Sequence, residues 1–135
     1  VTVNGDMLVQ IRSLASGEAI GLAVPGDWNL ITASVSEVHG FVLAHSYNTG
    51  VNVLSLASGE LLHSDGDGPD KNIALAPQRP GFLAWDGRSV IYQPIDGVSE
   101  AETLVSEHPG FIDDVSISPD GHWLATFTTE GEMRI

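Results

Sequence analysis

The hexapeptide Ser-Leu-Ala-Ser-Gly-Glu occurs twice in this chain, at residues 13–18 and again at residues 55–60, an offset of 42 residues. Each copy follows a short apolar run of the kind that forms a β-strand, at residues 8–11 and 51–54. A phrase that recurs at a period near 40 residues indicates a fold built from repeated units. We therefore expect a repeat protein, whose function depends on a surface rather than on one pocket.

The composition is that of a packed all-β chain. With 135 residues, the chain is long enough for one modest core. Hydrophobic residues make up 42% and charged residues only 17%, which excludes a disordered chain. The 15 glycines and 7 prolines, with few helical patterns between them, predict many tight turns between short strands.

The charge restricts the classes of partner. Eighteen Asp and Glu residues against five Lys and Arg residues give a net charge of −13, whereas nucleic acids and anionic membranes bind basic surfaces. We therefore expect protein partners, including chains with basic segments, and neither nucleic acid nor membrane. Without cysteine, a signal peptide or a span of ~20 apolar residues, the sequence favours an intracellular location, cytoplasmic or nuclear.

Turn signals divide the chain into approximate units at residues 1–27, 28–70, 71–110 and 111–135. The fourth is the clearest: residues 114–118 alternate between apolar and polar, Pro119-Asp-Gly121 predicts a turn, and residues 123–128 predict the return strand. Residues 99–108 allow two interpretations, a capped helical turn or a short outer strand.

This pattern predicts an all-β fold of β-propeller blades, each with four antiparallel strands. A β-sandwich is the alternative, but it would not explain why the same phrases recur at one period. The chain spans about three blade lengths, and propellers need about four to eight blades to close. We therefore expect an incomplete propeller, completed by missing sequence or by another chain.

Two segments resemble the WD-repeat family. Residues 115–126, Val-Ser-Ile-Ser-Pro-Asp-Gly-His-Trp-Leu-Ala-Thr, resemble the first two strands of a WD-repeat blade, and residues 51–60 resemble the third strand with its exit turn. His108 stands where these repeats often place a Gly-His pair. The third strand departs from the family, because Arg12, Leu54 and Gln93 occupy the position of its tryptophan. The family's buried His, Ser or Thr, Asp and Trp network is therefore expected to be incomplete in every unit.

No catalytic, cofactor-binding or metal-binding residue is predicted. The five histidines lack zinc-site spacing, and the sequence contains neither Gly-x-Ser-x-Gly nor a glycine-rich phosphate loop. The acidic loop at residues 65–70 resembles a calcium loop, but Ala76 stands where an EF-hand places its bidentate Glu. We expect His108 to be structural, at the turn into the next strand.

Acidic residues are the candidate partner-binding residues. One group is the loop with Asp65, Asp67 and Asp70, and the other is Asp113 with Asp114, expected in a loop that enters an inner strand. Such carboxylates can bind a Lys or Arg side chain of a partner; the alternative is that they are solvated turn residues. The tryptophans Trp28, Trp85 and Trp123 are expected in the core, unless one lies at a blade rim as an interface residue.

The resemblance implies a non-enzymatic WD-repeat-like scaffold for protein–protein interaction within a multi-subunit complex. Two alternatives stay open. The Ser-Pro-Asp-Gly phrase also occurs in propellers that serve as lid or accessory domains of a hydrolase or peptidase, and in secreted or periplasmic ligand-binding propellers. A Gly-x-Ser-x-Gly motif in adjoining sequence would favour the first, and a signal peptide would favour the second.

Overall fold

The computed structural model of the chain describes residues 2–3, 8–12, 14–23, 30–66 and 71–135. These residues form strands, turns and bends and contain no helix, so the all-β prediction is confirmed for them. The chain divides into two compact units, Val1–Pro69 and Asp70–Ile135. Each unit is described by itself.

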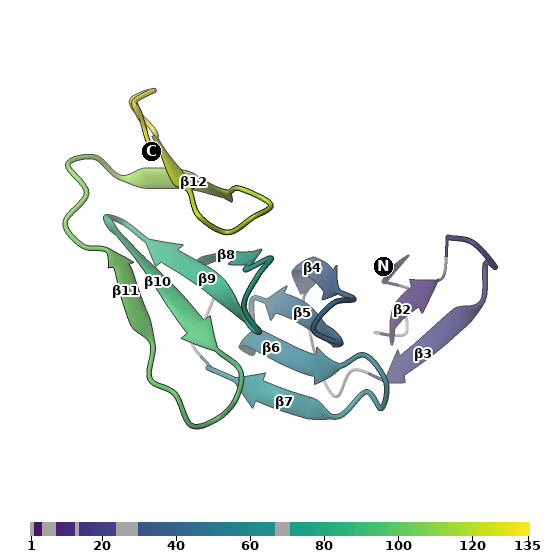
Figure 1. Cartoon of the computed structure of the whole chain (residues 1–135). Coiled ribbons are helices and arrows are strands. Elements are labelled where there is room, and N and C mark those ends of the chain that lie inside the picture. The colour runs from purple at the N-terminus through teal and green to yellow at the C-terminus, as the bar shows by residue number, and fades with distance from the viewer. Residues whose placement is uncertain (1, 4–7, 13, 24–29, 67–70) are drawn as a thin grey trace. The chain divides into compact units, whose positions relative to one another are not determined.

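The first unit contains two antiparallel sheets in which neighbours in sequence are neighbours in space (Figure 1). One sheet has three strands, β1 (Thr2–Val3), β2 (Leu8–Arg12) and β3 (Ala19–Ala23). The other has four strands, β4 (Leu30–Ser36), β5 (Phe41–Ser46), β6 (Gly50–Ser55) and β7 (Leu61–Ser64).

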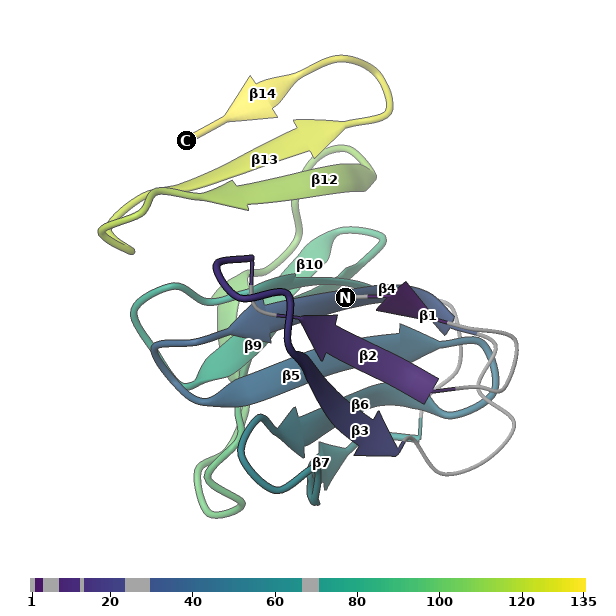
Figure 2. The same ribbon diagram turned by 90° about the vertical axis from the view of Figure 1, so that its right-hand side faces the viewer.

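The second unit also contains one four-stranded and one three-stranded sheet, in the opposite order along the chain. Its four-stranded sheet contains β8 (Asn72–Leu75), β9 (Gly81–Asp86), β10 (Ser89–Pro94) and β11 (Glu102–Val105). Its three-stranded sheet contains β12 (Ile112–Ile117), β13 (Leu124–Thr128) and β14 (Met133–Arg134), drawn as a separate layer in Figure 2. Of the two interpretations of residues 99–108, the short outer strand is therefore confirmed, as β11.

The last three residues of the repeated hexapeptide, 16–18 and 58–60, form the same turn in both places. The amide of Glu18 donates to Oγ of Ser16 at 3.3 Å, and the amide of Glu60 donates to Oγ of Ser58 at 3.3 Å. The glycine between them has a φ of 72° at position 17 and 75° at position 59, the left-handed region that favours glycine. The Ser-Gly-Glu end of the hexapeptide is thus part of a structural turn, between β2 and β3 in one copy and between β6 and β7 in the other.

The core of the second unit lies between its two sheets. Along β9 and β10, Leu83 pairs with Tyr92 and Trp85 pairs with Val90, so these four side chains share one face, called here the tryptophan face. It packs against the side chains of one face of the three-stranded sheet, called here the aliphatic face: Ile112, Val115, Ile117 and Leu124.

A β-bulge makes the aliphatic face possible. Side chains three residues apart on a regular strand point to opposite faces, yet Ile112 and Val115 are both buried in the same core. The register of β12 on β13 shifts between Ile112 and Asp114, which leaves Asp113 as the extra residue. The bulged carbonyl of Asp113 accepts a hydrogen bond from the indole Nε1 of Trp85 at 3.4 Å.

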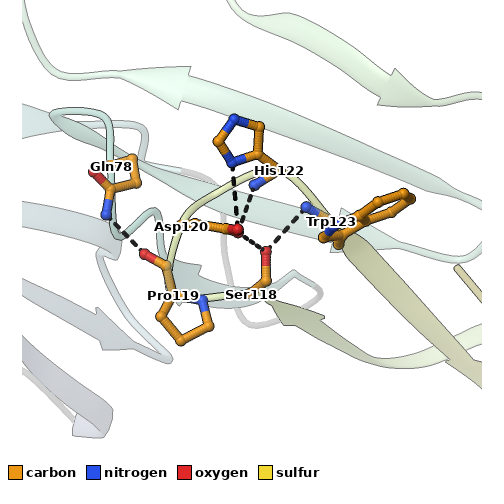
Figure 3. Close-up of polar contacts among 6 residues, drawn as sticks. All are labelled: Gln78, Ser118, Pro119, Asp120, His122 and Trp123. Carbon is orange, nitrogen blue, oxygen red and sulfur yellow. Dashed lines mark hydrogen bonds and ion pairs between the residues drawn. The ribbon is translucent and has the colours of Figure 1, made fainter.

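A second polar contact joins the two sheets at the turn between β12 and β13. The side-chain Nε2 of Gln78 donates to the carbonyl of Pro119 at 2.7 Å (Figure 3). Gly121 lies in the same turn, with a φ of 73°, and a Cβ there would be 2.9 Å from Cγ of Gln78. Only glycine fits this approach without strain, which explains the Pro-Asp-Gly phrase.

The tryptophan prediction was right for Trp85 and wrong for Trp123. Trp85 is 5% exposed in the core, whereas Trp123 is 64% exposed. Ser118 and Trp123 pair at the end of the hairpin, where the amide of Ser118 donates to the carbonyl of Trp123. Strand alternation therefore places Trp123 on the face opposite to Leu124. Trp28 lies outside the described residues.

Replacing Trp85 by alanine should destabilise the second unit by about 3–5 kcal/mol, because it removes a buried ring and leaves a cavity. The matched control Trp123→Ala should cost about 0.5 kcal/mol or less, since that ring is mostly in solvent. Chemical denaturation followed by circular dichroism at low protein concentration measures both. Equal losses in the two variants would contradict the packing described for Trp85.

Candidate interaction surface

The three-stranded sheet of the second unit has one apolar face that the other sheet of this unit does not cover. In β13, Leu124 belongs to the aliphatic face, and Thr126 lies on the same side of the sheet because it pairs with Val115. Ala125 and Phe127 therefore point to the other side. Phe127 pairs with Met133 across β13 and β14, and these two side chains are 38% and 57% exposed. We call this surface the free face, made of Trp123, Ala125, Phe127 and Met133.

A predicted acidic residue borders the free face. Asp114 pairs with Phe127 in the register of β12 on β13, so its exposed side chain lies on the same side of the sheet. Its Oδ1 accepts from the amide of Val115 at 2.9 Å. The prediction that Asp113 and Asp114 lie in a loop was wrong: both are in β12, because the bulge at Asp113 continues the strand past them.

The other predicted acidic residues belong to the first unit. The Oδ1 of Asp65 accepts from the amide of Val51 at 2.9 Å, and the amide of Asp65 donates to the carbonyl of Val51. This carboxylate thus extends the pairing of β6 with β7 by one step. Asp67 and Asp70 lie outside the described residues.

The turn at residues 118–123 gathers Ser118, Asp120 and His122 (Figure 3). The hydroxyl of Ser118 donates to Oδ1 of Asp120 at 2.5 Å, and the amide of His122 donates to the same oxygen at 3.1 Å. These hydrogen bonds hold the pKa of Asp120 below its ordinary value of 3.8, and the hydrogen bond from Ser118 makes the largest contribution. The serine hydroxyl is bonded to the carboxylate and not to the imidazole, so the group stabilises a turn and does not activate a nucleophile.

In Ser118→Ala, the pKa of Asp120 should rise toward 3.8, because the strongest stabilisation of its charged form is lost. The sign for stability follows: this hydrogen bond contributes above about pH 4 and is lost as the pH falls through the lowered pKa. A carboxyl-carbon NMR titration measures the change. Asp96, whose pKa is lowered by Ser99, is the internal control and should not move. An unchanged pKa for Asp120 would contradict this assignment.

His108 forms a buried pair with Thr126. Its Nε2 lies 3.0 Å from Oγ1 of Thr126, and its Nδ1 lies 3.1 Å from the carbonyl oxygen of Gly110. Both side chains are buried, at 4% and 3% exposure. This pair fixes the segment between β11 and β12, which is the structural role expected for His108.

Thr126→Val should destabilise the second unit by about 1–3 kcal/mol, since a side chain of equal shape leaves the buried Nε2 of His108 without its partner. Thr126→Ser keeps the hydroxyl and should retain most of the stability. Thermal or urea unfolding of the two variants gives the comparison. If the Thr126→Val variant were as stable as the original chain, the hydrogen bond between Thr126 and His108 would not contribute to stability.

Neither a metal site nor a membrane helix is found in the described part of the chain. Its His, Asp and Glu residues form no group of three or more that could hold a metal ion. It also contains no helix long and apolar enough to cross a membrane. Comparison with models of known protein families and with curated proteins finds no match to the chain.

Phe127 and Met133, which are exposed on the free face, are not among the residues predicted from the sequence to bind a partner. The buried pair Trp85 and Val90 occupies the same positions in its sheet as Phe127 and Met133 in theirs. This correspondence could have identified them, but it depends on which residues pair across the strands. The sequence does not determine that pairing to within one residue.

Proposed function

We propose that the chain is a non-enzymatic, WD-repeat-like propeller segment that acts as a scaffold for other protein chains. The observation that carries this proposal is the free face: three large apolar side chains, exposed on one side of a sheet, with Asp114 beside them. Monomeric proteins rarely expose a contiguous apolar surface unless it binds something. An adjoining carboxylate suits a partner with a Lys or Arg side chain.

The propeller part of the proposal is supported by the way the two sheets of the second unit stack. Ile73 pairs with Ala84, and Val115 pairs with Thr126, at the same 42-residue offset. The aliphatic face of sheet β12–β14 therefore corresponds to the side of sheet β8–β11 that is opposite to its tryptophan face. The contact between the two sheets thus joins faces that are not equivalent in the repeat. Repeated contacts of this kind arrange sheets head to tail, as blades are, and not face to face with two-fold symmetry.

The scaffold proposal predicts a partner protein that depends on the free face. Affinity capture from the source organism, followed by reconstitution from purified components, should give a complex that Phe127→Asp weakens at least about tenfold, as expected for an apolar anchor. Asp114→Asn should slow association and reduce its salt dependence, if the partner is basic.

The matched controls are Thr129→Asp for the introduced charge and Glu100→Gln for the removed one, both at exposed positions. Each should leave the affinity of the purified pair unchanged. A complex that forms equally well with Phe127→Asp, or the absence of any protein that can be reconstituted, would refute the scaffold proposal.

A further inference from the structure

We propose that the free face binds a further β-sheet of this same repeat. That sheet would place its aliphatic face on β13 and β14, as the aliphatic face of β12–β14 lies on β9 and β10. This inference rests on the proposed function and names the kind of partner. It follows from the correspondence of the two sheets in the second unit, position by position.

Equivalent positions have the same chemistry but differ in exposure. Trp85 pairs with Val90, and at the equivalent positions Phe127 pairs with Met133, so each sheet has an aromatic ring beside an aliphatic chain. Trp85 and Val90 are 5% and 0% exposed because a sheet covers them, whereas Phe127 and Met133 are 38% and 57% exposed. The free face is thus a tryptophan face without its cover.

The first unit contains a third example of the pair. In β5 and β6, His45 pairs with Val51, and both side chains are buried. A ring beside an aliphatic side chain at this position is therefore a property of the repeat. It is not a peculiarity of the exposed sheet.

The contacts between the two existing sheets define the chemistry of the partner. Its apolar surface should resemble Ile112, Val115, Ile117 and Leu124, branched aliphatic side chains that fit around a ring. The turn of the partner sheet should differ in polarity from the turn between β12 and β13. In the existing contact Gln78 donates to the carbonyl of Pro119, and the position equivalent to Gln78 in sheet β12–β14 is Asp120. Because a carboxylate accepts, the partner's turn should offer an N–H group or a basic side chain.

The experiment supplies such a sheet on the full chain. A second copy of residues 93–135 is fused after Ile135. Met133 corresponds to Val90, so Ile135 corresponds to Tyr92, and the added Gln93 continues the strand in register. Oxidation of Met133 by hydrogen peroxide, followed by peptide mass spectrometry, reports its exposure. In the original chain Met133 should react readily, and in the extended chain its oxidation should slow by about tenfold or more, because susceptibility follows exposure.

Phe127→Asp in the original sheet should restore fast oxidation of Met133 in the extended chain, and the charge control Thr129→Asp should not. Unchanged reactivity on extension, or no effect of Phe127→Asp, would overturn the inference. Light scattering that shows the original chain to be a dimer with Met133 protected would make a second copy the occupant instead. A lysine-rich peptide that protects Met133, where the added sheet does not, would assign the face to a basic segment.

These outcomes are separable from the test of the proposed function. Protection of Met133 by the added sheet, without any partner protein in the capture experiment, would refute the scaffold proposal and leave the sheet-binding face in place. A partner that binds through Phe127, together with an unprotected Met133 in the extended chain, would do the reverse.

Discussion

The second unit depends on the packing of Trp85 against the aliphatic face. A three-stranded sheet is marginal in water unless one face is covered, and β12–β14 obtains that cover from β9 and β10. The bulge at Asp113 allows this packing in two ways. It brings Ile112 and Val115 to the same side of β12, and it places the carbonyl of Asp113 where the indole of Trp85 donates to it. One extra residue thus satisfies the only polar atom of the ring and extends the apolar surface beneath it.

The two faces of the sheet β12–β14 are chemically different. One face presents the ring of Phe127 with Met133 beside it, and the other presents the branched aliphatic side chains Ile112, Val115, Ile117 and Leu124. In the second unit the branched side chains of the aliphatic face pack around the ring of Trp85, with the close interdigitation expected of a protein interior. The one contact described, within the second unit, therefore joins one kind of face to the other, and the sheet β12–β14 leaves its ring-bearing face exposed.

Much of the fold could be predicted from the sequence, because the signals were local. The alternation of residues 114–118, the Pro-Asp-Gly turn and the repeated hexapeptide each determine the backbone of a few residues, and the structure has strands and turns there. The candidate site was less predictable. Asp113 and Asp114 come shortly after Pro109-Gly110, a turn signal, with only Phe111 and Ile112 between. A bulge there cannot be distinguished from a strand start without the pairing partner. Trp123 was assigned to the core by its residue type, but its position relative to Leu124 decides its face.

The order of the strands also bears on how the protein folds. In every sheet of the described chain, each strand pairs with the next one in sequence. Such pairing closes only short loops, so the entropy lost before the first favourable contact is small, and low contact order is associated with rapid folding. When sheets form separately and meet through one contact, as in the second unit, stability is approximately a sum of the stabilities of the sheets and of that contact. Individual sheets could therefore diverge in sequence, as the position shared by His45, Trp85 and Phe127 illustrates, without each change requiring compensation across the whole chain.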